Sequence, residues 1–246
     1  MIENVSPKKF LGQHFLIDEN ISKKIVNAVN LKEFDKIVEI GPGKGALSKY
    51  LFDFSDKLIL IEYDTESVEF IKSSFKKHSP NIVKKDFLKY NLKDVLTQTS
   101  KNLIIGNFPY NISSQIIFKI LENYLLVGNL IGMFQKEVAE RIISKPNSKE
   151  YGIISVKTQL LYDVKILFDV SPNVFFPKPR VNSSVISMSR KKNIKINFDL
   201  KLFDKLVKLS FQQRRKKIKN SLKKLDIKEN ILCLLYTSDA ADESVS

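Results

Sequence analysis

The chain of 246 residues is 43% hydrophobic and 28% charged, as is ordinary for a soluble globular protein with one substantial core and room for a small second domain. Its net charge of +14 indicates a polyanionic partner such as nucleic acid, ahead of an anionic membrane surface. The single cysteine excludes an intrachain disulfide and a cysteine-based metal site, and no apolar run resembles a membrane span or a signal peptide, so we expect a cytoplasmic protein.

The N-terminal segment is the first candidate for ligand contact. Its first 20 residues carry two phenylalanines, a glycine and the pair Gln13-His14 among basic side chains. This composition suits an arm that wraps a ligand, although an ordered arm without a ligand would use the same residues. From Glu19 to Val29, apolar residues recur on one helical face, which predicts a helix.

A βαβ unit with a glycine-rich turn follows. A strand over 37–40 leads into the turn and a helix to about Phe54, and a second strand over 58–61 ends at Glu62, which lies 21 positions after Gly41. Glycines let a bulky ligand approach the backbone, and the carboxylate can accept both hydrogen bonds of a ribose diol. The unit predicts nucleoside binding, but Gly41-x-Gly43-x-x-Ala46 suits a dinucleotide as well as S-adenosylmethionine.

Asp86 stands at the end of the next predicted strand. A helix over 66–77 and a strand at 82–83 precede it. Its carboxylate could accept a hydrogen bond from an adenine amino group, and a helix cap or a solvated turn is the alternative interpretation.

The segment Asn107-Phe108-Pro109-Tyr110 is the strongest candidate for chemistry. The β-branched run 103–105 before it predicts a buried parallel strand, and ligands bind at the carboxyl ends of such strands. Pro109 fixes its own φ and stiffens the corner. An amide, a free carbonyl and an aromatic ring held close together could bind a planar base, with hydrogen bonds to its amino group and stacking on its face.

The following elements alternate between helix and strand. We predict a helix to about 123, a strand over 130–134, a helix over 137–142, a polar loop over 145–150, one or two strands over 156–168 and a strand over 184–188. Phe175 precedes a stiff Pro-x-Pro segment. It could plug the core at a sheet edge, or close the second face of a base bound at Tyr110.

The C-terminal part is strongly basic. An apolar stripe predicts a helix over 198–209, and the segment 190–228 holds 15 Lys and Arg against 3 Asp and Glu. Polar side chains interleaved with the charges favour phosphate contacts with RNA over a merely solvated face. The residues expected to make these contacts are Arg214, Arg215, Lys216, Lys217 and Lys219.

Three regions are therefore expected. Residues 1–192 form an α/β, Rossmann-like doubly wound domain, and residues 193–232 form a small basic all-helical domain that is incomplete. Residues 233–246 carry no Lys or Arg and resemble the translation of a sequencing adapter. We expect this tail to be read-through beyond a native chain that stops near residue 232.

Taken together, the motifs resemble those of the ribosomal RNA adenine dimethyltransferase family, of the type that modifies the bacterial small subunit. The matching segments are 12–16, 39–43, 62–64, 86–88, 106–113, 135–141, 175–183 and 213–216, in the family's order. Two positions depart from the family pattern, because Phe108 replaces the usual Leu or Ile and His14 replaces the common Asn.

The resemblance implies the fold of an S-adenosylmethionine-dependent methyltransferase and a role for each matching residue. Cofactor contacts fall to Gln13, His14, Leu16, Gly41, Gly43, Glu62, Asp86 and Asn107, and the catalytic set is Asn107, Phe108, Pro109, Tyr110 and Phe175. Within these sets Glu62 would hold the ribose and Asp86 the adenine amine of the cofactor. The implied partner is the 16S RNA of the small ribosomal subunit, with a monomeric enzyme, no metal and no membrane.

The chemistry expected at Asn107 follows from the target. An adenine amine is a poor nucleophile because its lone pair is delocalised into the ring. If the Asn107 oxygen and the carbonyl of Phe108 or Pro109 accept its two N–H bonds, the nitrogen regains its lone pair and can attack a sulfonium methyl in line. The target must be extruded from stacked RNA, and Tyr110 with Phe175 would stack on its faces.

Three alternatives stay open from the sequence. A nicotinamide-dependent dehydrogenase explains the βαβ unit but not segment 107–110 or the basic C-terminal part. The large-subunit methyltransferase that confers macrolide resistance shares most motifs, but segments 137–141 and 213–216 favour the small-subunit type. A non-catalytic RNA-binding or assembly factor would not need an intact segment 107–110.

Overall fold

The computed structural model describes residues 5–192, 194, 196–212 and 221–222. The backbone divides into two compact units, Met1–Ile194 and Lys195–Ser246, and each is described by itself. The predicted roles of residues 193–232 and 233–246 stay predictions, because most of these residues lie outside the described part.

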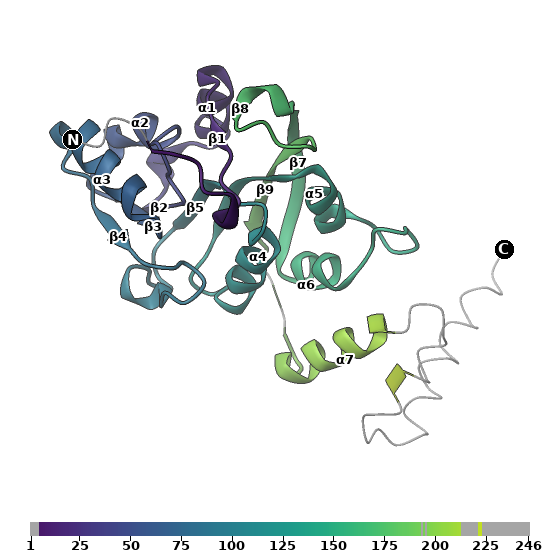
Figure 1. Ribbon diagram of the computed structural model, residues 1–246. Helices are drawn as coiled ribbons and strands as arrows, with labels where there is room; N and C mark the ends of the chain where they lie inside the picture. Colours follow the sequence, from purple (N-terminus) through teal and green to yellow (C-terminus); the bar gives the residue numbers. More distant parts are fainter. Residues whose placement is uncertain (1–4, 193, 195, 213–220, 223–246) are drawn as a thin grey trace. The chain divides into compact units, whose positions relative to one another are not determined.

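A seven-stranded sheet forms the centre of the first unit over its described residues (Figure 1). Its order is β4 (Ile82–Lys84), β3 (Leu58–Glu62), β2 (Lys36–Ile40), β5 (Asn102–Asn107), β6 (Asn129–Gln135), β9 (Ser183–Arg190) and β7 (Tyr162–Val170). The strands from β4 to β6 are parallel, and β9 pairs antiparallel with both β6 and β7. The predicted α/β sheet is confirmed, with an antiparallel edge.

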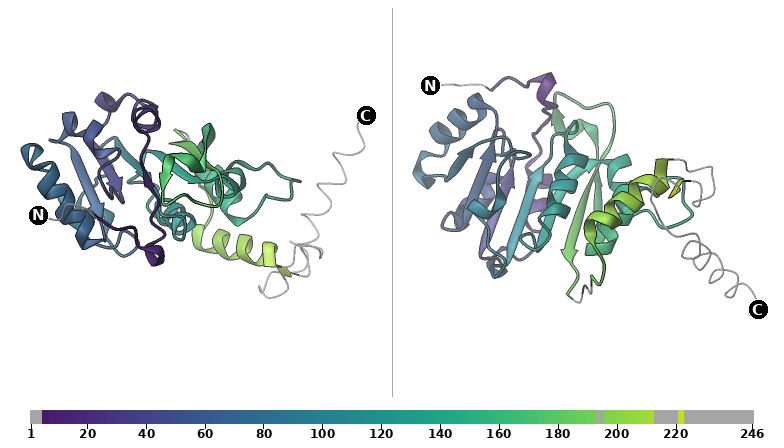
Figure 2. Two further views of the ribbon diagram at one scale, coloured as in Figure 1. Left: turned by 45° about the horizontal axis from the view of Figure 1, so that its top comes forward. Right: turned by 90° about the horizontal axis from the view of Figure 1, so that it is seen from below.

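The strand order places helices on both faces of the sheet. The chain steps outward from β2 to β3 and β4, then returns to the other side of β2 with β5. Right-handed crossovers in opposite directions put their helices on opposite faces, as Figure 2 shows. The helices are α1 (Glu19–Val26), α2 (Ser48–Leu51), α3 (Thr65–Ser74), α4 (Ser113–Glu122), α5 (Lys136–Ile143) and α6 (Ile153–Leu161).

The core explains why the parallel strands are apolar throughout. With helices on both faces, the side chains of both faces are buried, as at Ile37 and Val38 in β2 and Leu103 and Ile104 in β5. The strand order reverses between β2 and β5, and a crevice for ligands is expected at the carboxyl ends of strands at such a switch point.

The N-terminal arm forms a second, small sheet. Strand β1 (Phe15–Leu16) pairs antiparallel with β8 (Phe175–Phe176), so that Phe15 faces Phe176 and Leu16 faces Phe175. Figure 1 shows this pair beside the carboxyl-end side of the large sheet. The arm is thereby tied to a segment far away in the sequence.

The expectation of strands over 156–168 is wrong for its first half. Residues Ile153–Leu161 form helix α6, and only the second half belongs to β7. The helix begins where the Gly152 N–H donates to the Ser155 hydroxyl at 3.0 Å. Its buried residues include the polar Ser155 and Thr158, so the hydrophobic pattern is blurred and alternation was a poor guide.

In the second unit, helix α7 spans Leu200–Gln212, which confirms the predicted helix. Leu206 and Leu209 on this helix pack against Leu222 in a small apolar cluster. The five residues predicted to contact RNA, Arg214, Arg215, Lys216, Lys217 and Lys219, lie outside the described residues. None of the described helices is long and apolar enough to cross a membrane.

Candidate active site

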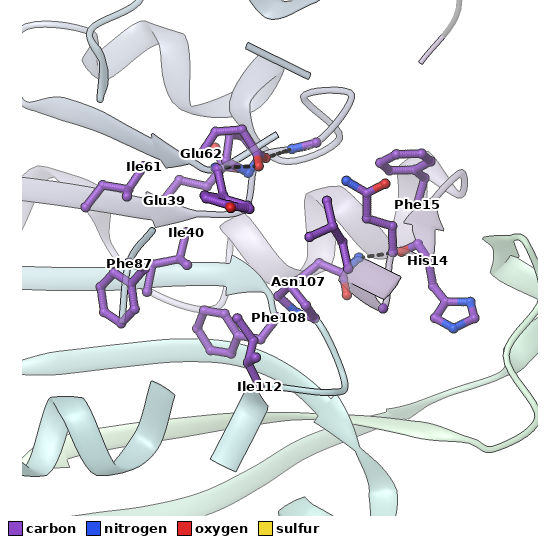
Figure 3. Close-up of a pocket in the computed structure, with 18 of the residues that line it drawn as sticks. His14, Phe15, Glu39, Ile40, Ile61, Glu62, Phe87, Asn107, Phe108 and Ile112 are labelled. Carbon is purple, nitrogen blue, oxygen red and sulfur yellow. Dashed lines mark hydrogen bonds between the residues drawn. The ribbon is translucent and has the colours of Figure 1, made fainter. Parts of the chain in front are cut away.

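A cavity of about 220 Å³ lies at the switch point, between the arm and the ends of four parallel strands. It is lined by residues 11–16, 39–44, 46–47, 61–63, 85–88 and 107–112. Figure 3 shows Glu39 and Glu62 in one part of this pocket, Asn107 near its middle, and His14 and Phe15 of the arm beyond. All the predicted cofactor residues line the pocket, as do Phe108, Pro109 and Tyr110.

The turn after β2 requires its glycines. Gly41, Gly43 and Gly45 have φ of 65°, 56° and 77°, in the left-handed region that other residues rarely adopt. A Cβ atom on Gly43 would also stand 2.9 Å from the Phe15 ring. The glycine turn and the arm therefore pack directly on one another, and the backbone of the turn is open to a ligand.

Glu62 is held in place by the backbone at the end of β3. Its carboxylate accepts hydrogen bonds from the N–H groups of Gly43 at 3.0 Å, Tyr63 at 2.7 Å and Asp64 at 2.8 Å. Burial raises the pKa of Glu62, although these three hydrogen bonds work in the opposite direction. Oε1 accepts the bonds from Tyr63 and Asp64 and Oε2 accepts the one from Gly43, so a lone pair of Oε2 stays free to accept a hydrogen bond from a ribose hydroxyl.

Glu39, which the sequence analysis did not single out, is a second buried carboxyl group in the pocket wall. It is 1% exposed, and the Ser48 hydroxyl donates to it at 2.7 Å. Burial raises the pKa of Glu39 to about 8, and the charge of Glu62 adds to the rise while the Ser48 bond opposes it. The sequence did hold a signal for Glu39, because an acidic residue inside an otherwise apolar strand is unusual.

The raised pKa of Glu39 gives a pH-dependent stability. The folded state holds this proton up to about pH 8, whereas the unfolded state loses it near its ordinary 4.5, so stability falls as the pH rises through that window. We expect Glu39→Gln to flatten the fall by up to about 1.4 kcal/mol per pH unit. Urea unfolding at several pH values between 5 and about 8 checks this, and equal slopes for variant and wild type would contradict it.

Asn107 is the last residue of β5, and its side-chain amide is already oriented. Its Nδ2 donates to the main-chain oxygen of His14 at 2.9 Å, which Figure 3 shows as a dashed line. No described residue donates to its Oδ1. The Pro109 carbonyl accepts from the Ile112 N–H at 3.2 Å, while the carbonyl of Phe108 receives no hydrogen bond from the described residues. Two acceptors, Asn107 Oδ1 and Phe108 O, therefore remain available at this corner.

Phe108 serves as packing under this corner. Its ring is buried and meets the ring of Phe134 edge-on, with centroids 5.0 Å apart. Gly106 and Gly132 leave the room for it, because a Cβ atom on either would stand within 2.7 Å of the Phe108 ring. The packing of the ring thus fixes the main chain of Phe108 at this corner.

Tyr110 is positioned by contacts with two residues that are distant from it in the sequence. Its hydroxyl hydrogen-bonds with that of Ser183, with 2.5 Å between the oxygens, and the ring of His14 stacks on it with centroids 5.1 Å apart. Burial raises the pKa of Tyr110, so the phenol stays neutral. The Nδ1–H of His14 donates to the carbonyl of Pro177 at 2.6 Å. His14 thus links the arm to the segment after β8.

Phe175, the predicted second stacking ring, is not brought to the pocket. It is 3% exposed and belongs to the hydrophobic core, paired with Leu16.

Asp86 does line the pocket. Its carboxylate also accepts from the Leu88 N–H at 2.9 Å and so closes a turn, which was the alternative interpretation of this residue. Gln13 lines the pocket while its Oε1 accepts from the Lys8 N–H at 2.8 Å.

The arm is fixed at its other end by Lys8, whose role the sequence analysis missed. The ammonium group of Lys8 forms ion pairs with Asp64 and with Glu66, the latter at 3.1 Å. The hydrogen bond that Lys8 donates to the Asp64 carboxylate raises the pKa of Lys8. Nothing in the sequence distinguished Lys8 from its neighbour Lys9, because the partners stand more than fifty positions away.

We expect Lys8→Met to weaken the binding of S-adenosylhomocysteine by about five-fold, the scale of a partly exposed ion pair. Methionine keeps the aliphatic stem but leaves this end of the arm unpaired, so segment 11–16 closes the pocket less firmly. Titration calorimetry measures the effect. Lys9→Met is the matched control, since Lys9 is exposed and forms no ion pair with a described residue; equal affinities of the two variants would refute the role of Lys8.

The residues present fit S-adenosylmethionine. The glycine turn exposes backbone at Gly41 and Gly43, Glu62 presents an oriented carboxylate, and Asp86 stands at the neighbouring strand end. Among the described residues, no group of three His, Cys, Asp or Glu side chains could hold a metal ion.

The sheet order, with a pocket at its switch point, is that of an S-adenosylmethionine-dependent methyltransferase. The family model described as "Ribosomal RNA adenine dimethylase" matches residues 4–242. The chain belongs to this family, and it is an enzyme. The dehydrogenase alternative is thereby set aside.

Individual relatives agree with the family. A protein of Flavobacterium johnsoniae named "Ribosomal RNA small subunit methyltransferase A" is 50% identical over 230 residues, which cover 94% of this chain and 88% of the relative. A dimethyladenosine transferase of Plasmodium falciparum has a similar structure, with a TM-score of 0.75 at 25% identity over 95% of this chain and 83% of that one. The 23S rRNA methyltransferase ErmE shares the fold, with a TM-score of 0.67 at 23% identity, covering 86% and 84%.

Proposed function

We propose that the protein dimethylates the exocyclic amines of two adjacent adenines near the 3′ end of 16S ribosomal RNA in the small subunit, during ribosome biogenesis. Relatives between 40% and 50% identical carry the name "Ribosomal RNA small subunit methyltransferase A", which supports the small subunit as the target. We further propose that the enzyme acts in the cytoplasm as a monomer.

The position of Asn107 carries the proposal. Its Nδ2 is engaged by the His14 carbonyl, so its oxygen is turned to a defined position in the pocket wall. The free carbonyl of Phe108 follows on the same rigid corner. Two acceptors beside one another match the two N–H bonds of an adenine amine, and they localise the lone pair on the nitrogen.

No general base is needed for this reaction. Bound S-adenosylmethionine supplies an electrophilic methyl group, and methylation leaves the amine nitrogen positively charged and acidic. Its proton can pass to water directly. His14 has a structural contact here, in which its Nδ1–H donates to the carbonyl of Pro177. The contribution of the protein is to extrude, orient and hold the base.

Contacts with the RNA are divided between the two units in this proposal. Tyr110 stacks on the extruded adenine, held by Ser183, and the basic residues Arg214, Arg215, Lys216, Lys217 and Lys219 contact phosphates. A stacking role for Phe175 requires its exposure, and its burial favours instead a supporting role beneath Leu16.

The test is to incubate the protein with methyl-labelled S-adenosylmethionine and small ribosomal subunits that lack adenine dimethylation. We expect label in two adjacent adenines near the 3′ end of the small-subunit RNA, located by primer extension. Large subunits serve as the parallel substrate. Label in the large-subunit RNA would instead support the macrolide-resistance type, and binding of S-adenosylhomocysteine without transfer to either RNA would support a non-catalytic assembly factor.

A further inference from the structure

Two phenylalanine side chains lie exposed on segments that border the active-site pocket. Phe10 is 76% exposed and Phe176 is 58% exposed, whereas a buried phenylalanine would contribute to the core. Single exposed apolar residues are common on proteins. These two, however, are each linked to the segment that carries Asn107 and Tyr110, Phe10 by a hydrogen bond and Phe176 through Pro177 and His14.

Phe10 is tied to that segment by its main chain. It belongs to the 3₁₀ turn Lys9–Leu11, and its carbonyl accepts from Asn111 Nδ2 at 3.2 Å. The turn ends at Gly12, where a Cβ atom would stand 2.6 Å from the Asn111 side chain. The next residues of the arm line the pocket. The Phe10 ring is therefore held at the edge of the active site.

Phe176 is linked to the same segment through its neighbour Pro177. In β8 the side chains alternate, so Phe175 enters the core and Phe176 faces solvent. The following residue, Pro177, accepts the hydrogen bond from His14, and His14 stacks on Tyr110. One hydrogen bond and one ring contact thus separate the Phe176 segment from the predicted stacking residue of the target base.

Positive charge accompanies both rings. Lys9 precedes Phe10, and Lys178 and Arg180 follow Phe176. All three are exposed and form no ion pair with another described residue. Aromatic faces beside unpaired cations are the arrangement by which proteins hold single-stranded nucleic acid, because the bases stack while the phosphates meet the charges.

We propose that the aromatic rim, defined as Phe10 and Phe176 with Lys9, Lys178 and Arg180, binds the unpaired nucleotides on either side of the target adenine. The inference rests on the proposed function and adds to it a specificity surface. With one ring on each of two segments that are linked to the corner at Tyr110, the neighbours of an extruded base can stack outside the pocket while the target lies inside it. The rim thereby favours unpaired over duplex RNA.

The test uses the full chain and a short RNA hairpin whose loop carries two adjacent adenines. A 2-aminopurine placed beside the adenines reports stacking by fluorescence quenching, and anisotropy gives the affinity. We expect Phe176→Ala and Phe10→Ala each to weaken RNA binding by about ten-fold and to reduce the quenching. Phe176→Trp should retain both, because it preserves an aromatic face. Lys178→Met with Arg180→Met should lower the salt dependence of log Kd by about 1.4.

Leu125→Ala is the matched control, since Leu125 is 46% exposed in the connection that enters the amino end of β6, whereas the pocket lies at the carboxyl ends of the parallel strands. Melting temperature and affinity for S-adenosylhomocysteine should be unchanged in all these variants. The proposed rim would be overturned if Phe176→Ala had the RNA affinity and the quenching of the wild type. It would also be overturned if the wild type did not bind the hairpin. Wild-type binding with quenching but no methylation of small subunits would overturn the proposed function alone.

Discussion

Replacement of Asn107 by alanine is expected to lower the rate of methyl transfer by about 10²- to 10³-fold, the effect of removing one positioned polar group from a reacting centre. In the proposed mechanism the side-chain oxygen is one of two acceptors for the adenine amine, and the main-chain carbonyl of Phe108 alone would not localise the lone pair. Single-turnover rates on unmethylated small subunits measure the loss, while the affinity for RNA should stay close to that of the wild type.

The variant also releases the bond to the His14 carbonyl, so a control must separate catalysis from anchoring of the arm. Asn111→Ala provides this control, because the side-chain amide of Asn111 also donates a hydrogen bond to the arm, at the carbonyl of Phe10. We expect Asn111→Ala to change the single-turnover rate at saturating cofactor by only a few-fold. If the two variants lose rate equally, Asn107 acts through the arm and the proposed mechanism is wrong.

The second large effect is expected at Glu62. Glu62→Gln should weaken the binding of S-adenosylhomocysteine by about 10²-fold, since an amide accepts a ribose diol more weakly than a carboxylate does and turns an N–H₂ group toward the pocket or toward Gly43. Calorimetry measures the affinity. RNA binding without cofactor should be unaffected.

A fall in stability accompanies this change, because at least one buried N–H group at Gly43, Tyr63 or Asp64 loses its acceptor. The melting temperature therefore has to be recorded beside the affinity. Glu69→Gln is the control, since Glu69 is an exposed carboxylate on α3, the helix that follows the same strand. An affinity of Glu62→Gln within two- to three-fold of this control would argue against a ribose contact.

The sequence predicted those parts of the site that depend on local pattern. Buried parallel strands give short apolar runs, and each of the runs before Gly41, Glu62 and Asn107 forms a strand whose end lines the pocket. The glycines of the turn could be recognised from the sequence for the same reason, since their positive φ is a property of the local backbone. Their ligand roles stay predictions.

Contacts between distant segments could not be predicted in this way. Phe175 and Phe176 are neighbours of the same type, and only the pairing of β8 with β1 decides which ring is buried. The link from Lys8 to Asp64 and the bond between Tyr110 and Ser183 likewise join segments that the fold alone brings together. The sequence allowed Phe175 either to plug the core or to stack on a base bound at Tyr110, and the structure shows it in the core.

The most direct measurement is a crystal structure of the protein with S-adenosylhomocysteine and an RNA that carries the two unmodified adenines. The account predicts one adenine in the pocket, with its N6 about 2.7–3.2 Å from both Asn107 Oδ1 and the main-chain oxygen of Phe108. An adenine whose N6 lies out of hydrogen-bond reach of both oxygens, or whose ring is bound outside the pocket, would contradict it.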